Sequence, residues 1–300
     1  MRVFVTGATG LVGSALVRDL LDAGHQVLGL ARSDEAAAAV QNAGAQVHRG
    51  SLADLESLRT GAAAADGVVH TAFIHDFSNF MASVETDRRA VETFGEALAG
   101  SDRPLVITSG TGMLPPGQPS TEEDAPGPDA HSPRAGTEAV ALAFAERGVR
   151  VSLVRLPPSV HSEADKSGFV PMHIGIARSK GFVPYVGDGS NRWATVHQLD
   201  AARVFRLAVE SAPAGSRLHA IGEEGVPFRE IAEAIGRRLK MPASSISAQE
   251  AAELGFLGGF ISLDLAAESS ITRKLLGWEP VHAGLIEDLD AGRYSRAHPA

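Results

Sequence analysis

The stretch that decides the fold of this chain is Thr6-Gly7-Ala8-Thr9-Gly10-Leu11-Val12-Gly13. It follows the apolar run Val3-Phe4-Val5, which is typical of a short buried strand. It also opens a helical pattern that runs from Leu11 to Ala23, and Gly24 is placed to end that helix. The three glycines of the stretch therefore lie in a strand-to-helix turn.

Each of these glycines has a distinct physical role. Gly7 permits the tight turn, Gly10 lets the backbone approach a pyrophosphate, and Gly13 lets the helix pack closely on the strand. The N-terminus of the helix offers free N–H groups and the positive end of its dipole to phosphates. We predict a dinucleotide-binding turn, and the alternative is a glycine-rich turn in another kind of α/β protein.

Strand and helix patterns alternate up to residue 156. Further strands are predicted at 25–31, 46–48, 67–72, 104–109 and 149–155, and the helices between them include 34–43, 87–98 and 134–147. This alternation predicts an α/β fold, a doubly wound parallel (Rossmann) sheet with right-handed crossovers. We assign residues 1–156 to this dinucleotide-binding domain.

Residues 157–300 show a different pattern, with prolines, glycine breaks and short helices, for example at 172–179, 199–210 and 227–240. We predict a small, mostly helical C-terminal lid that binds the substrate, with residues 195–222 returning to the sheet. Such a lid would pack on the carboxyl edge of the sheet, where a substrate would bind.

The residues after the second strand bear on the choice of cofactor. An acidic residue at this place binds the adenosine ribose, but this chain has Arg32 and Ser33. A guanidinium and a hydroxyl suit a 2′-phosphate, so we favour NADP over NAD. The alternative is that Arg32 is a solvated charge, and Asp34 just beyond could compete. Ser51 and Leu52, after the third strand, are expected to contact the adenine.

Composition excludes several classes of function. The net charge of −9 argues against nucleic acid and anionic membranes as partners, which leaves a small-molecule substrate. The chain has no cysteine, so disulfides, thiolate zinc sites and thiol catalysis are excluded, and we predict no metal site. The first strand begins at residue 2 and no apolar run could span a bilayer, so a cytoplasmic protein is expected. A homodimer through helices 87–98 and 134–147 is a further possibility.

Several segments together resemble the extended and atypical short-chain dehydrogenase/reductases, also called the NAD-dependent epimerase/dehydratase group. The matching segments, in chain order, are Thr6 to Gly13, Val68 to Ala72, Leu105 to Ser109, Val154 to His161, Tyr185 to Gly189, Val196 to Asp200, Phe228 to Ile231 and Leu275 to Pro280. The resemblance covers nearly the whole length, and it implies the Rossmann fold and a nicotinamide cofactor.

The resemblance also implies which residues contact that cofactor. They are Gly7, Thr9, Gly10, Leu11, Val12 and Gly13 at the pyrophosphate, Thr71, Ala72 and Phe73 on the ribose side, Thr108 on the fifth strand, and Pro157, Pro158, Ser159 and Val160 at the nicotinamide.

The chain departs from the family pattern at the residues that carry the family's chemistry. Members of the family usually carry a serine or threonine after the fifth strand, and a tyrosine and a lysine four residues apart on the next helix. This chain has only Tyr185 and Tyr294, neither of them on that helix. Counting back from the sixth strand places the two slots near Arg134 and Glu138, which share a helix face. These two residues form either a salt bridge or a substituted catalytic pair.

Other side chains are candidates for the missing proton donor. Ser109 or Thr111 could hydrogen-bond a carbonyl oxygen, while Arg134 could polarise it and Glu138 could bond the nicotinamide ribose. His131 is the first choice as donor and His161 the second, with His75 as a third, although each of these histidines could be structural. His197 and Asp200 resemble a family motif, and we interpret His197 as structural and Asp200 as a helix cap.

Three functions compete on this basis. The first is an NADP-dependent oxidoreductase that acts on a small carbonyl, imine or related compound with an atypical proton donor. The second is a redox-sensing NADP-binding protein without catalysis. The third is a nucleotide-sugar epimerase or dehydratase, which we rank lower because that chemistry usually needs the tyrosine and the lid shows no basic cluster for a nucleotide diphosphate.

Overall fold

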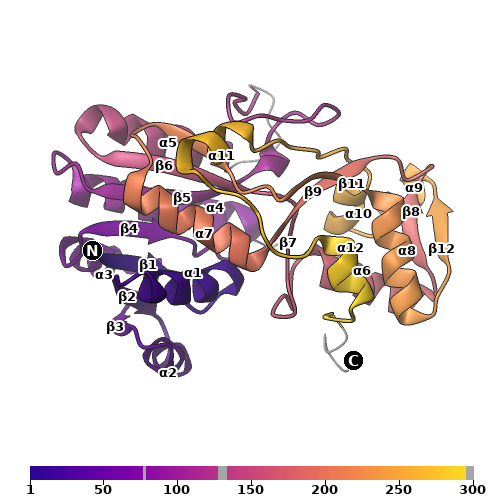
Figure 1. The fold of residues 1–300 in the computed structure, drawn as a ribbon, viewed down its shortest axis with the longest axis horizontal. Coiled ribbons are helices and arrows are strands. Elements are labelled where there is room, and N and C mark those ends of the chain that lie inside the picture. Colours follow the sequence, from indigo (N-terminus) through magenta and orange to yellow (C-terminus); the bar gives the residue numbers. More distant parts are fainter. Residues whose placement is uncertain (77–78, 128–133, 295–300) are drawn as a thin grey trace.

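The computed structural model describes residues 1–76, 79–127 and 134–294. Within these residues the main feature is a seven-stranded sheet in which all neighbouring strands are parallel (Figure 1). The strand order is β10-β6-β5-β4-β1-β2-β3, formed by β1 (Arg2–Thr6), β2 (Gln26–Ala31), β3 (Gln46–Arg49), β4 (Gly67–His70), β5 (Pro104–Gly110), β6 (Arg150–Leu156) and β10 (Ser216–His219). This is the Rossmann strand order with one added strand, so the predicted doubly wound sheet is confirmed.

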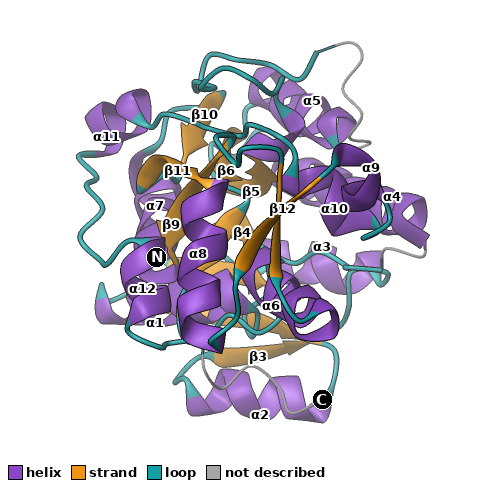
Figure 2. Ribbon diagram, turned by 90° about the vertical axis from the view of Figure 1, so that its right-hand side faces the viewer, coloured by secondary structure: helices purple, strands orange, loops and turns teal. Residues whose placement is uncertain are grey.

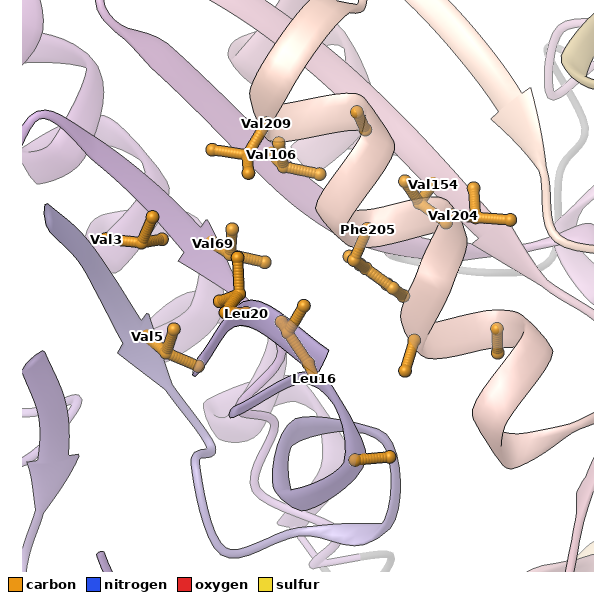
Figure 3. Close-up of a cluster of buried hydrophobic side chains, with 14 of the residues drawn as sticks. Val3, Val5, Leu16, Leu20, Val69, Val106, Val154, Val204, Phe205 and Val209 are labelled. Atoms are coloured by element: carbon orange, nitrogen blue, oxygen red, sulfur yellow. The ribbon is translucent and has the colours of Figure 1, made fainter. Parts of the chain in front are cut away.

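Alternation of side chains along β1 sets the layers of the molecule. Val3 and Val5 point to one face of the sheet, and Phe4 points to the other. The valine face packs on Leu16 and Phe205, which lie on the two helices α1 (Leu11–Asp22) and α7 (Gln198–Ser211) (Figure 3). The Phe4 face is covered by α3 (Leu55–Ala63), α4 (Phe80–Leu98) and α5 (Ala135–Ala143), while α2 (Asp34–Asn42) packs on β2 and β3 at the sheet edge. The result is a sheet between two helical layers.

The C-terminal region is built around an apolar cluster of its own and lies in front of the sheet in Figure 2. Its helices are α6 (Phe169–Lys180), α8 (Phe228–Leu239), α9 (Ala248–Ala252), α10 (Phe256–Ile261) and α12 (Leu285–Asp290), whereas α11 (Ser270–Leu276) packs on α7 and β10 of the sheet domain. Its strands are β7 (Ser159–His161), β8 (Val183–Val186), β9 (Arg192–His197), β11 (Glu223–Pro227) and β12 (Ala243–Ile246). Here β9 pairs with β7 and β11, and β8 pairs with β12. The domain boundary at residue 156 stays a prediction, while α7 and β10 pack with the main sheet.

Three predicted features differ from the structure. The helix predicted at 87–98 begins at Phe80, and the helix predicted at 134–147 is α-helical only over Ala135–Ala143 before a 3₁₀ turn. The prediction that Asp200 caps α7 is wrong, because the His197 ring caps it by accepting from the backbone N–H of Leu199. The Asp200 carboxylate instead accepts from the backbone N–H groups of residues 281 and 282 and from the ring of His282. No helix in the described ranges is long and apolar enough to cross a bilayer.

Candidate active site and cofactor cleft

A cleft of about 750 Å³ opens beside the glycine-rich turn. One wall consists of that turn and the start of α1, with Thr9, Gly10, Leu11 and Ser14. The opposite wall comes from the C-terminal region, with Glu163, Ala164 and Lys166 after β7 and with Ala291, Gly292 and Arg293 after α12. The cleft therefore lies where the sheet domain meets the C-terminal region.

The glycine-rich turn fits the phosphates of a dinucleotide. Gly7 has φ +69°, and a side-chain carbon added at Gly13 would lie 2.0 Å from the Gly7 carbonyl oxygen. Both positions therefore require glycine. The backbone N–H of Ser14 makes the first hydrogen bond within α1, to the carbonyl of Gly10, so the three preceding N–H groups have no acceptor inside the helix. These donors and the helix dipole suit a pyrophosphate.

The adenosine end has two arginines rather than the one predicted. Arg32 follows β2 directly, and Ser33 caps α2 by accepting from the backbone N–H of Ala36. Arg49 lies beside them, because its Nη1 donates to the Ser33 carbonyl at 2.6 Å and its Nη2 bonds Asp34. Sequence analysis missed Arg49, whose only signal was its place at the end of β3, paired in register with Ala31. Ser51 is half-buried nearby, and Leu52 is part of the hydrophobic core.

Two of the hydroxyls expected near the ribose and nicotinamide, those of Thr71 and Thr108, donate hydrogen bonds to backbone carbonyls of neighbouring strands. Thr71 Oγ1 donates to the Thr6 carbonyl at 2.7 Å, and Thr108 Oγ1 donates to the His70 carbonyl at 2.8 Å. Ser159 differs, since its Oγ is buried and has no hydrogen-bond partner among the described residues. It follows Pro157 and Pro158 and precedes Val160, in the segment expected beside the nicotinamide, and its role there stays a prediction.

Glu138 is not paired with Arg134. Its carboxylate takes two hydrogen bonds from Arg155, Nε at 2.9 Å and Nη2 at 2.7 Å, and a third from Ser109 Oγ at 2.5 Å. The Arg155 side chain has no exposed surface and that of Glu138 is 5% exposed, so this is a buried ion pair. The predicted pairing of Glu138 with Arg134 is thereby corrected, while the predicted roles of Ser109 and Glu138 toward a ligand stay predictions.

Arg134 immediately precedes α5 and packs against Phe73 and the end of β5. Its guanidinium lies over the Phe73 ring at 4.1 Å, and its Nη2 donates to the Thr108 carbonyl at 3.3 Å. Its side chain is 20% exposed, and together with Ser109 and Thr137 it borders a narrow recess that has no room for a water molecule. Desolvation lowers the pKa of Arg134 from its very high ordinary value, but a guanidinium keeps its charge in proteins. A fixed positive charge therefore lies at the carboxyl end of β5.

A buried chain of polar side chains leads to this charge from the centre of the sheet. Thr6 Oγ1 lies 2.6 Å from His70 Nδ1, and His70 Nε2 lies 3.1 Å from Asp87 Oδ1. The other oxygen of Asp87 is 3.7 Å from Arg134 Nη2 and has no hydrogen bond within the described part of the chain. Asp87 is therefore a buried counter-charge for Arg134. Sequence analysis missed it, since nothing in the helical pattern marks this one acidic residue.

The remaining candidates for the proton donor differ in their surroundings. His161 is buried and holds Asp288 at 2.7 Å, and Thr111 is buried with a 3.4 Å bond to the Leu156 carbonyl, so neither is placed as a donor to a substrate. His131 lies outside the described residues. His75 is exposed, and its ring meets Phe73 edge to face at 5.3 Å. Desolvation, and then the charge of Arg134, lower the pKa of His75.

The two tyrosines lie in the C-terminal region. Tyr185 is on β8, and Tyr294 follows α12, where its buried hydroxyl lies 3.4 Å from Asp165. Burial raises the pKa of Tyr294. No group of side chains in the described ranges is arranged to hold a metal ion.

Comparisons with known proteins agree with this geometry. A model of the NAD dependent epimerase/dehydratase family matches residues 3–221. An uncharacterized protein of Schizosaccharomyces pombe is 47% identical over 295 residues, which cover 98% of this chain and all of that protein. A 4-hydroxy-2-methyl-3-oxo-4-farnesyl-3,4-dihydroquinoline-1-oxide ketoreductase of Stigmatella aurantiaca is 31% identical over 225 residues, 72% of this chain and 66% of that protein.

Solved structures share the fold. A dTDP-glucose 4,6-dehydratase from Streptomyces venezuelae with NAD bound superposes with a TM-score of 0.76 at 21% identity, over 99% of this chain and 98% of that one. The sheet order, the glycine cradle and the family match lead to one assignment. The chain belongs to the NAD-dependent epimerase/dehydratase family and is an NAD(P)-dependent enzyme of oxidoreductase or epimerase type.

Proposed function

We propose that this protein is an NADPH-dependent reductase of a carbonyl compound that carries an apolar group, with Arg134 in place of the usual tyrosine. The observation that carries the proposal is the partly exposed Arg134 guanidinium at the carboxyl end of β5, positioned by the Thr108 carbonyl, Phe73 and Asp87. A hydride acceptor with oxygen develops negative charge as it is reduced, and a fixed cation stabilises that charge.

The chemistry divides between the cofactor and the chain. A bound nicotinamide would supply a hydride for the carbonyl carbon, which would leave the electrons of the C=O bond as negative charge on the oxygen. Arg134 stabilises the resulting alkoxide, and His75 passes it a proton from water to complete the alcohol. Neutral imidazole both donates and accepts a proton, which suits the lowered pKa of His75.

Aromatic side chains favour an apolar substrate. The rings of Phe169 and Phe260 lie 5.0 Å apart, and those of Phe260 and Phe256 lie 4.9 Å apart. A side-chain carbon added at Gly112 would lie 3.4 Å from the Phe260 ring, so this cluster adjoins the loop that follows β5 and the recess. The ketoreductase relative is named for a substrate with a farnesyl chain near a ketone, which supports the same class.

The preference for NADP is supported by the two arginines at the adenosine end. Arg32 and Arg49 flank Ser33, whose oxygen accepts from Ala36 and whose proton stays available to a phosphate oxygen. A 2′-phosphate would bind bidentately to a guanidinium, whereas the free ribose hydroxyls of NAD would leave Arg32 without an anionic partner among the described residues, and Arg49 with Asp34 alone.

Substitution of Arg134 tests the proposal. We expect Arg134→Gln to lower kcat for NADPH-dependent reduction of apolar ketones about 100-fold, with Arg134→Lys keeping more activity. The Kd for NADPH, measured by titration, should change little in both variants. Arg147→Gln is the control, since Arg147 pairs with Glu96 on the surface and lines neither the cleft nor the recess.

Other outcomes favour the other two functions. Tight NADPH binding without turnover of any ketone, aldehyde or imine would favour the redox sensor. Tightly bound NAD⁺ that survives purification, with interconversion of nucleotide sugars, would favour the epimerase. Unchanged kcat in Arg134→Gln would contradict the role of Arg134.

A further inference from the structure

The wall of the cleft opposite the glycine-rich turn has a composition that the family's cofactor motif does not explain. Lys166 and Arg293 both line it, in the same cleft as the N-terminus of α1. We propose that the C-terminal region supplies the second half of the pyrophosphate site, so that Arg293, assisted by Lys166, binds the cofactor phosphates from the side opposite α1. This inference rests on the dinucleotide cofactor of the proposed function.

The charges of the cleft support this assignment. A pyrophosphate carries two negative charges, and the N-terminus of α1 offers neutral N–H donors and a partial positive charge equal to roughly half a unit. Two cations on the opposite wall complete the neutralisation, and Glu163 on the same wall opposes it. A guanidinium binds phosphate oxygens bidentately, and an ammonium adds a point charge.

Arg293 is held in place by one hydrogen bond, which leaves most of its N–H donors available to a ligand. Its Nη1 donates to Asp288 Oδ1 at 2.8 Å, and the other oxygen of Asp288 bonds His161 Nδ1 at 2.7 Å. Asp288 is fully buried, whereas the Arg293 side chain is 43% exposed at the cleft. Within the described residues its side chain makes no other hydrogen bond, so most of its five N–H donors remain for a ligand. Asp288 and His161 are thus positioning residues for a cofactor-binding arginine.

The cleft residues also differ in how they should respond to substitution. Lys166 is exposed and forms no ion pair in the described part of the chain, so Lys166→Gln removes a charge without breaking a contact. Glu163 is the one acidic residue of that wall among those described, so Glu163→Gln should strengthen binding of an anion. A purely structural wall would not give effects of opposite sign.

The experiment is a titration of the full chain with NADPH, NADH, ADP-ribose and adenosine. ADP-ribose has the pyrophosphate without the nicotinamide, and adenosine has no phosphate. We expect Arg293→Gln to weaken NADPH, NADH and ADP-ribose by a common factor of about tenfold and to leave adenosine unchanged. Lys166→Gln should weaken the same three ligands about threefold, and Glu163→Gln should tighten them. Arg293→Lys should bind them with intermediate affinity.

Two controls keep the result interpretable. Arg147→Gln has the same loss of charge on a remote surface and should match the unsubstituted protein. Thermal unfolding of each variant reports whether loss of the Asp288 contact disturbs the fold, and the Lys166 and Glu163 variants decide the matter if Arg293→Gln does not fold.

The outcomes separate this inference from the proposed function. If the unsubstituted chain binds NADPH while the Arg293, Lys166 and Glu163 variants stay within twofold of it, this inference is overturned and the proposed function stands. If the unsubstituted chain binds no dinucleotide and no ADP-ribose, both are overturned.

Discussion

At the residue scale, the buried pair of Arg155 and Glu138 makes a sharp prediction about stability. Replacement of Glu138 by glutamine leaves the fully buried Arg155 guanidinium without its counter-charge. Breaking a buried pair on one side costs about 3–5 kcal/mol. We expect Glu138→Gln to lower the free energy of unfolding by about that amount in urea denaturation, whereas Glu85→Gln, which breaks the exposed pair with Arg88, should change nothing measurable.

The same variant distinguishes the structural role of Glu138 from the predicted cofactor role. If Glu138 bound the ribose of the cofactor, Glu138→Gln would weaken NADPH binding with little change in the free energy of unfolding. Wild-type stability together with weakened NADPH binding would therefore contradict the interpretation given above.

The choice between NADPH and NADH is also decided at single residues. We expect Arg32→Ala and Arg49→Ala each to weaken NADPH about 10- to 100-fold, because each loses a charged hydrogen bond to the 2′-phosphate, and to change NADH affinity little. Arg147→Ala serves as the remote control. Paired titrations with the two cofactors measure the ratio, and equal losses for NADPH and NADH would sink the NADP assignment.

At the element scale, helix α6 makes the stability depend on pH through His173. This side chain is 2% exposed and meets Phe228 edge to face at 5.3 Å, and burial lowers its pKa to about 4 from 6.5. The unfolded chain then binds the proton more tightly than the folded chain. The contribution of neutral His173 to the free energy of unfolding is therefore fully present above pH 6.5 and is lost as the pH falls from 6.5 towards 4. Through this residue alone, the free energy of unfolding drops by about 2 kcal/mol between pH 7 and pH 5.

A variant isolates that contribution. His173→Leu should remove it, so that the difference between pH 7 and pH 5 in urea denaturation becomes about 2 kcal/mol smaller than in the unsubstituted protein. The constant packing cost of the substitution cancels in this comparison. An unchanged dependence on pH would show that His173 is not the group responsible.

Elements also differ in how far the sequence alone predicts them. The β1–α1 turn is local, since Gly7 and Gly13 contact one another across six residues, and its prediction is confirmed. Contacts between distant segments were not predictable. Glu138 of α5 accepts hydrogen bonds from Ser109 on β5 and Arg155 on β6, and Asp200 accepts from a backbone N–H 81 residues away. Helical spacing alone therefore suggested the wrong partner for Glu138 and the wrong role for Asp200.

At the scale of the whole molecule, the cleft lies between two regions that have separate apolar cores. Two clusters cover the two faces of the sheet, a third holds the C-terminal region together, and residues from both regions line the cleft. The alternating pattern predicted the first core, but the irregular C-terminal pattern did not reveal that residues 291–293 return to the glycine-rich turn. A homodimer through α4 and α5 stays a prediction.

The most direct test is a titration of the purified chain with NADPH and NADH. The oxidation of NADPH is then measured from the loss of its absorbance as apolar ketones are added. We expect tighter binding of NADPH than of NADH, with oxidation of NADPH that depends on the ketone and is lost in Arg134→Gln. Absence of binding to either cofactor, or turnover that survives in Arg134→Gln, would contradict it.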